Sequence, residues 1–240
     1  MSGAFAVRKR FWTSASAVPA DGGTGFTVHL DARALTTPLK SPLVVPTLIL
    51  AEAIAQEWDA QGDEIVPQAM PLTRAANAAI DKVVPNRDAV ARMLADYGGT
   101  DLLCYRAAEP EALVARQNAR WDPWIDWAET QFGVTLRIGT GVVHVAQSDA
   151  ATARLSEPVL RLGAWQLTAF HDLVVLSGSL VLALAVQTRA LDPTEAWALS
   201  RLDEDRQHEQ WGIDAEAQSA AEEKQAAFCC AARLLDLLEV

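Results

Sequence analysis

The chain has 240 residues, 50% of them hydrophobic and 21% charged, which excludes a disordered protein and leaves material for one large or two small domains. Its net charge of −11 opposes nucleic acid and anionic membranes as partners, because binding phosphates draws on clustered Lys and Arg. Three Cys without a Cys-x-x-Cys spacing indicate neither a zinc site nor a disulfide framework. A neutral or basic protein partner is more compatible with this charge.

Residues 11–39 have the pattern of antiparallel strands. Phe11–Thr13 is strand-like, and residues 25–30 alternate with period two after a Gly-rich stretch, residues 21–25. This stretch lies between strands and no Lys-Ser/Thr follows it. We therefore interpret it as a hairpin turn and not as a phosphate-binding loop.

A helix is predicted over residues 48–59, with Thr47 as its N-terminal cap. Its apolar residues form a stripe that ends at Trp58 and faces the strands. With the hairpin, this helix predicts a small α+β domain over residues 1–84. Helical patterns dominate the rest, so residues 85–240 are expected to form a larger, mostly helical domain. The predicted fold class is α+β.

Most of the second part is predicted to be helical. The expected helices after a first one over 72–84 span residues 87–97, 111–132, 148–162, 163–188, 193–210 and 214–239. Pro123 is expected to break the helix over 111–132, because proline removes a backbone donor. Trp121, Trp124 and Trp127 lie three apart on this helix and are interpreted as core residues. Residues 134–138 alternate and predict an extended excursion.

Two stretches bear on where the protein resides. The longest apolar run, residues 173–186, is shorter than the roughly 20 residues of a membrane span and is predicted to be a buried helix. Met1–Val7 has no long apolar region and is followed by basic residues, which does not fit a secretory signal. We expect a cytoplasmic protein without membrane insertion.

The segment Leu202–Glu216 is the densest in groups that carry function. At helical spacing its acidic residues, two Gln and a Trp would lie around neighbouring faces, because residues three and four apart are neighbours on a helix. An acidic face with an aromatic residue is a plausible docking surface. The alternative is a solvated face with Trp211 packed inward and Gly212 ending or bending the helix.

Signals for catalysis are sparse. Ser179 lacks the Gly-x-Ser-x-Gly frame of a nucleophile elbow. A di-iron carboxylate bundle needs Glu-x-x-His on two helices, and Asp205-x-x-His208 is the one approximation to it. A carboxylate-bridged metalloenzyme in the helical bundle is therefore the alternative function. No catalytic, cofactor-binding or metal-binding residue is assigned.

Several short motifs occur in a specific order along nearly the whole chain. They are Lys9-Arg10-Phe11-Trp12, Leu30-Asp31-Ala32-Arg33, Glu57-Trp58-Asp59-Ala60-Gln61, Met70-Pro71-Leu72-Thr73, Ala79-Ile80-Asp81, Thr100-Asp101-Leu102, Gln117 before Trp121-Asp122-Pro123, and the segment Leu202–Glu216. With these motifs the chain resembles the family of ATP synthase assembly chaperones that bind the alpha subunit of the soluble F1 sector.

The resemblance implies two domains, no catalytic activity and no cofactor. Family members hold the alpha subunit soluble until it meets beta, so the expected partner is the unassembled F1 alpha subunit, bound by a monomer. The implied location is the bacterial cytoplasm, and the mitochondrial matrix for eukaryotic relatives. The resemblance marks an acidic residue, Glu204 or its neighbour Asp203, and the Trp of Glu-Trp-Asp, Trp58, as needed for function.

Two groups of candidate residues follow from the segment and the resemblance. Those expected to bind the partner are Asp203, Glu204, Gln207, Trp211, Asp214 and Glu216. Those expected to support the fold are Trp12, Trp58, Pro71, Asp81 and Asp101. Glu204 is expected to pair with a basic residue of the client and to set the rate of encounter more than affinity. Trp58, which ends an apolar stripe, is expected to be a fold residue.

Overall fold

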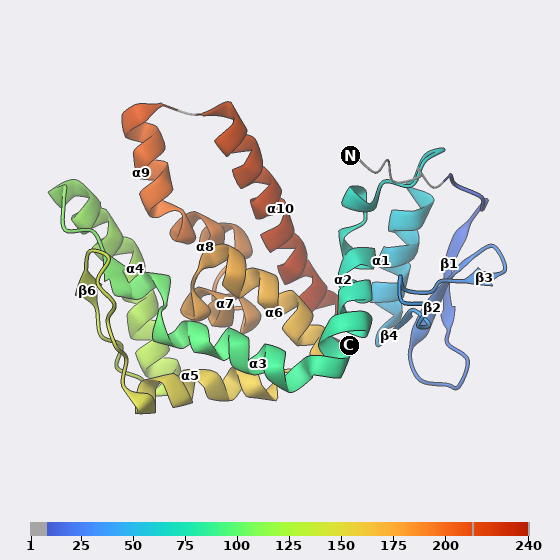
Figure 1. Cartoon of the computed structure of the whole chain (residues 1–240), viewed down its shortest axis with the longest axis horizontal. Coiled ribbons are helices and arrows are strands. Elements are labelled where there is room, and N and C mark those ends of the chain that lie inside the picture. Colours follow the sequence, from blue (N-terminus) through green and yellow to red (C-terminus); the bar gives the residue numbers. More distant parts are fainter. Residues whose placement is uncertain (1–8, 213, 240) are drawn as a thin grey trace, which may run out of the picture. The chain divides into compact units, whose positions relative to one another are not determined.

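The computed structural model describes residues 9–212 and 214–239. The stretch Met1–Val7, interpreted above as lacking a targeting signal, and Ile213 lie outside the described residues. The chain forms two compact units, Met1–Pro85 with Arg233–Val240, and Asn86–Ala232. The first carries an antiparallel sheet and the second is mostly helical (Figure 1), which confirms the α+β class. That residues 1–84 and 85–240 are separate folding domains stays a prediction.

A four-stranded antiparallel sheet forms the base of the first unit. Its strands are β1 (Ala15–Pro19), β2 (Phe26–Leu30), β3 (Arg33–Ala34) and β4 (Val44–Val45). β2 is central: it pairs along its whole length with β1, while β3 and β4 pair with its two ends. The predicted hairpin is confirmed. A Cβ at Gly25 in its turn would lie 2.7 Å from the carbonyl oxygen of Val45, so this position requires glycine.

The expectation that Phe11–Thr13 is a strand is wrong, because β1 begins at Ala15. The Arg10 guanidinium donates to the carbonyl oxygens of Trp12 (3.1 Å) and Thr13 (3.0 Å). The Asp31 carboxylate accepts a hydrogen bond from the Thr13 N–H at 3.1 Å. Side chains thus satisfy backbone groups that a β-ladder would have used.

Helix α1 (Leu48–Asp59) packs against β1 and β2, as predicted. The Thr47 hydroxyl accepts from the Leu50 N–H at 3.3 Å and donates to the Leu237 carbonyl at 2.5 Å, which ties the start of α1 to the end of the chain. Near the other end of α1, Trp58 packs edge-on against buried Trp12, with ring centroids 5.1 Å apart. That Trp58 supports the fold stays a prediction.

The helical part of the first unit continues from α1. Its elements are η1 (Pro67–Ala69), α2 (Pro71–Ala78), the π-helical η2 (Ala79–Val83) and η3 (Val84–Asn86). The predicted helix over 72–84 is therefore α-helical only in its first half. Pro71 is the first residue of α2, where a missing N–H costs nothing. Asp81 accepts from the Thr37 hydroxyl at 2.7 Å, which joins η2 to the chain that follows β3.

The second unit contains most of the helices. They are α3 (Arg87–Ala95), α4 (Glu111–Phe132), α5 (Asp149–Arg161), α6 (Ala164–Ser177), α7 (Leu180–Gln187), α8 (Pro193–Ser200), α9 (Leu202–Trp211) and α10 (Ala215–Leu237), whose last turn belongs to the first unit. Short elements η4 (Asp96–Gly99), η5 (Leu102–Cys104), β5 (Tyr105–Arg106) and β6 (Gly139–Thr140) connect them, and β5 pairs with β6 in parallel. None of the helices described has the length and apolar character that a membrane crossing requires.

The predicted helix over 163–188 is wrong, because the chain forms two helices separated by Gly178 and Ser179. Gly178 ends α6 with a left-handed φ of +68°. Buried Asp101 accepts from the Ser179 hydroxyl (2.8 Å) and the Val181 N–H (2.9 Å), and so fixes the start of α7. Likewise, the expected helix over 193–210 is divided at Arg201 into α8 and α9.

The expected break in α4 is also wrong, since Pro123 lies inside an uninterrupted helix. Tertiary contacts hold the helix on both sides of the proline. Trp121 is buried, and its indole N–H donates to the Leu199 carbonyl at 2.9 Å. Trp124 and Trp127 form an edge-on pair 6.1 Å apart and are half-buried, so the core interpretation is fully correct only for Trp121.

Candidate functional site

Helix α9 carries the acidic segment and lies mostly outside the core. Of its ten residues, all within the described part of the chain, only Leu202 is buried. Gly212, with φ +89°, ends the helix, as the alternative interpretation of a solvated face predicted. Trp211 is 75% exposed, so the alternative in which Trp211 packs inward is wrong. An exposed Trp at the end of an acidic helix is free to contact a partner.

Asp203 faces α4 and is held by a buried amide. The side-chain N–H₂ of Gln117 donates to Asp203 Oδ1 at 2.6 Å, and its Oε1 accepts from the Ala107 N–H at 2.7 Å. Gln117 is fully buried. Both ends of its amide are therefore committed, and the carboxylate of Asp203 serves to position α9.

Glu204 lies one residue further on and remains accessible. Its carboxylate pairs with the Arg201 guanidinium at 3.2 Å, yet its side chain is 45% exposed. Arg201 in turn lies over the Trp197 ring, 5.7 Å from its centroid. The pair is anchored at the junction of α8 and α9, where a basic group of a partner could compete for Glu204.

The remaining candidates face solvent. Gln207, Asp214 and Glu216 are exposed. Asp214 also has a local role, because its carboxylate accepts from the Glu216 N–H at 2.9 Å at the start of α10. The structure thus divides the six predicted residues into one positioning residue, one partly paired residue and four exposed ones.

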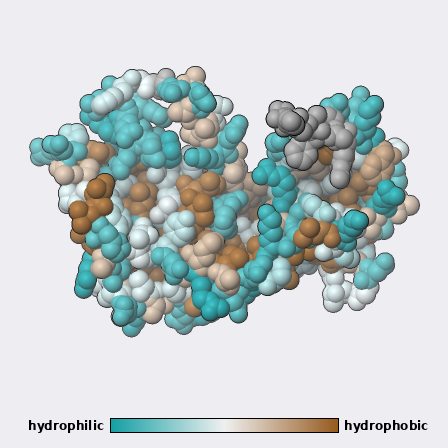
Figure 2. Space-filling view, in the orientation of Figure 1, coloured by the Kyte–Doolittle hydropathy of each residue, from teal (hydrophilic) through white to brown (hydrophobic). Residues whose placement is uncertain are grey.

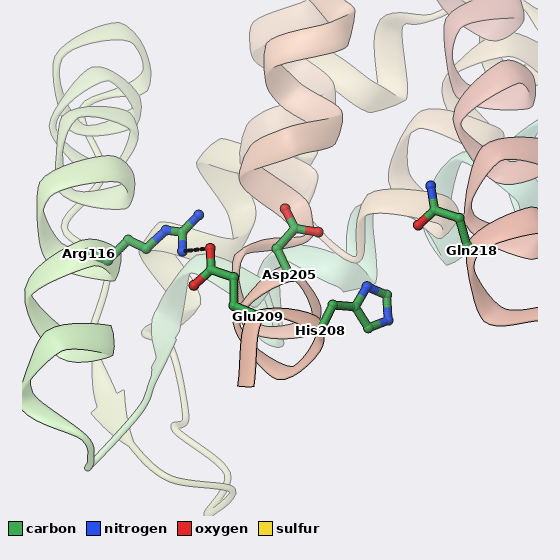
Figure 3. A pocket seen from close by; sticks show the side chains of 5 residues that line it. All are labelled: Arg116, Asp205, His208, Glu209 and Gln218. Atoms are coloured by element: carbon green, nitrogen blue, oxygen red, sulfur yellow. Dashed lines mark hydrogen bonds and ion pairs between the residues drawn. The ribbon is translucent and has the colours of Figure 1, made fainter. Parts of the chain in front are cut away.

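Beside α9 lies an open hollow of about 350 Å³. Arg116 of α4, Gln218 of α10 and three residues of α9 line it (Figure 3): Asp205, His208 and Glu209. Arg116 donates to Glu209 at 2.8 Å, and this hydrogen bond lowers the pKa of Glu209. All five lining residues are polar or charged and the hollow is open to solvent, which suits a side chain of a protein partner better than an enclosed small molecule.

Three residues that position the site were not predicted for this role. Arg116 and Gln117 hold α9 from α4. Arg106 is buried and binds Asp122 (2.9 Å) and Asn118 (3.1 Å) of α4. The sequence around each of these residues does not indicate its role, because the side chain that it binds lies beyond the neighbouring turns of the chain. The position of Gln117 within a family motif was the one available indication.

Comparison with known proteins identifies the family of this chain. The family model of the ATP12 chaperone protein matches residues 9–129. This chain belongs to the ATP12 family. Atp12 from Paracoccus denitrificans is 51% identical, with a TM-score of 0.91 over 96% of this chain and 98% of that one. A variant of that protein with lysine in place of an aspartate is 50% identical, with the same TM-score and coverage. Mitochondrial atp12 of Schizosaccharomyces pombe is 26% identical over 85% of this chain and 74% of its own length.

The ATP12 family comprises chaperones that assist the assembly of ATP synthase and are not enzymes. The alternative of a carboxylate metalloenzyme is therefore wrong. Across residues 9–212 and 214–239 no three His, Cys, Asp or Glu side chains are grouped to hold a metal ion. Asp205 and His208 line the hollow on one helix, without the ligands from other helices that a di-iron site needs.

Proposed function

We propose that this ATP12 chaperone binds the unassembled alpha subunit of F1 and prevents its aggregation until the alpha subunit meets beta. An unassembled subunit exposes apolar surface that the assembly later buries, and such surface promotes aggregation. The observation that carries the proposal is the position of Trp211, 75% exposed at the end of acidic α9. Trp is strongly enriched among residues that dominate binding energy at interfaces.

The residues of the acidic segment have different roles in this proposal. Glu204 meets a basic group of the client and accelerates encounter, because charges on an interface steer association. Trp211 supplies the apolar anchor, with Gln207, Asp214 and Glu216 around it. Asp203 keeps α9 in place through Gln117 and contacts the client little.

We further propose that the protein acts as a monomer in the cytoplasm. The net charge of −11 supports a monomer, because two copies repel each other unless an interface compensates. Sedimentation at several protein concentrations tests this state, and a mass that rises with concentration would contradict it.

The test is co-purification of the chaperone with separately expressed alpha and beta subunits, scoring which subunit stays soluble. We expect selective capture of alpha, weakened by Glu204→Lys and by Trp211→Ala. Both variants should remain folded, because both side chains lie largely outside the core. The lysine variant of the Paracoccus relative, which keeps this fold, supports the use of charge reversal.

Glu52→Lys is the matched control, since Glu52 is an exposed residue of α1 in the other unit and undergoes the same charge change. It should leave capture of alpha unchanged. Equal capture of alpha and beta, or capture of neither, would contradict the proposed function. Full capture by Glu204→Lys and Trp211→Ala would remove α9 from the client-binding surface.

A further inference from the structure

The second unit also exposes apolar residues on the excursion between α4 and α5. Val142 is 98% exposed and Val143 is 75% exposed, and one residue separates this pair from the end of β6. We call this pair the valine tip. The space-filling view shows a hydrophobic cluster over the region of β6 (Figure 2), whereas the surface over α9 is hydrophilic. Two adjacent valines that are largely exposed have no role in the core.

The excursion is a defined structure and not a loose loop. Arg137 and Gln147 exchange hydrogen bonds across its base, from the Arg137 N–H to Oε1 and from Nε2 to the Arg137 carbonyl, each 2.9 Å. The Tyr105 hydroxyl accepts from the Val145 N–H at 3.4 Å. A Cβ at Gly139 would collide with Val145. Because the base is already ordered, a partner that covers the valine tip pays little ordering entropy.

A continuous path of contacts joins the excursion to α9 within the second unit. β6 pairs with β5, where Arg106 is opposite Thr140, and Arg106 binds α4. The next residue, Ala107, donates to Gln117, and Gln117 donates to Asp203 of α9. The valine tip and the acidic helix are thus attached to the same stretch of α4.

We infer that the valine tip is a second, apolar contact for the same client, covering surface that the client later buries on assembly. This inference rests on the proposed function. A second copy of this chain is disfavoured as the occupant, because each copy carries a net charge of −11. The partner that fits is a protein with an apolar patch on a neutral or basic surface. Charge on α9 sets the rate of association with the client, and the valine tip slows dissociation of the complex.

The experiment measures association and dissociation of the purified alpha subunit on immobilised chaperone. Val142→Ser with Val143→Ser should raise Kd about 10- to 100-fold, mainly through faster dissociation, because two apolar side chains lose their buried contact. Glu204→Lys should mainly slow association and reduce its dependence on salt. Val175→Ser is the matched control, since Val175 is 41% exposed on α6 of the same unit, and it should leave both rates unchanged.

The outcomes separate this inference from the proposed function. Wild-type chaperone that does not bind alpha overturns both. Binding of alpha with unchanged dissociation from the double serine variant overturns the inference alone. Sedimentation identifies the other occupant: self-association of the wild type that the serine variant abolishes would show that the valine tip covers a second copy, which also overturns the inference.

Discussion

Helices α7 and α9 belong to the same unit and have similar lengths, but opposite kinds of interaction hold them. In α7 every residue from Leu180 to Val186 is buried, and buried Asp101 binds its first turn. In α9 only Leu202 is buried, and polar side chains of α4 hold the rest. The core therefore determines the position of α7, whereas a few hydrogen bonds determine that of α9.

This contrast teaches where folding and binding can be separated. Substitutions around α7 remove buried contacts and should act on the free energy of unfolding. Substitutions on the exposed face of α9 should act on the client with little effect on stability, because surface changes away from special features are usually small. The residues between the two, on α4, should affect both.

The largest effect is expected for Asp101→Ala. The buried carboxylate accepts from the Leu103 and Val181 N–H groups and from the Ser179 hydroxyl, and alanine leaves these donors unpaired. The free energy of unfolding should fall by about 3 kcal/mol or more. Urea denaturation measures the loss. Ser179→Ala removes one of these donors and also the hydroxyl that caps α7, and it should lower the free energy of unfolding by less than Asp101→Ala does. A larger loss for Ser179→Ala would contradict this prediction.

The same site predicts a pH dependence. Burial raises the pKa of Asp101, against the hydrogen bonds from Val181 and Leu103 that lower it. The folded state then binds the proton more tightly than the unfolded state, whose aspartate has a pKa of about 3.9. The stabilising contribution of protonated Asp101 is fully present below the unfolded pKa, and it is lost as pH rises through the folded pKa. Urea denaturation across pH should show this decline in wild type and a flatter profile in Asp101→Asn; equal slopes would contradict it.

A smaller effect is expected for Gln117→Leu. The change leaves the Ala107 N–H and the Asp203 carboxylate without their partner, at a cost of about 1–3 kcal/mol, and it releases α9. Client capture should weaken although Gln117 is buried and cannot touch the client. A double-mutant cycle with Asp203→Ala measures the link, with an expected coupling of about 0.5–3 kcal/mol. Additive losses would show that the two side chains act independently.

The smallest effect concerns the pKa of Glu209. The Arg116 hydrogen bond lowers this pKa most, and Arg206 contributes less. Arg116→Ala should therefore raise the pKa of Glu209 toward the ordinary value of about 4.3, and Arg206→Ala should raise it less. Titration of the side-chain carboxyl by NMR measures both shifts. A larger rise of the pKa in Arg206→Ala than in Arg116→Ala would mean that the main contact of Glu209 is within its own helix and not with α4.

Sequence reasoning succeeded where local patterns decide the structure. The glycines after β1 and the alternation of residues 25–30 predicted the hairpin, and Thr47 marked the start of α1. It failed where distant contacts decide. Asp101 determines where α7 begins from 80 residues earlier in the chain, and Trp121 helps to keep α4 continuous around Pro123 through a carbonyl of α8.

The candidate site shows the same division. Spacing alone placed Asp203, Glu204 and Trp211 on one helix, and this helix is present. Spacing did not distinguish their surroundings. The buried amide that holds Asp203 comes from Gln117, 86 residues away, and the pattern within α9 does not indicate which of its acidic side chains that amide binds.

By itself the sequence determined the α+β class, the acidity, the family resemblance and the helical spacing of the acidic segment, because these depend on composition and neighbouring residues. Only the tertiary structure decided that Asp203 is engaged by α4, that Trp211 is exposed, and that the valine tip and α9 are attached to one stretch of α4. These properties depend on hydrogen bonds and burial between residues far apart in the chain, which form only when the unit is packed.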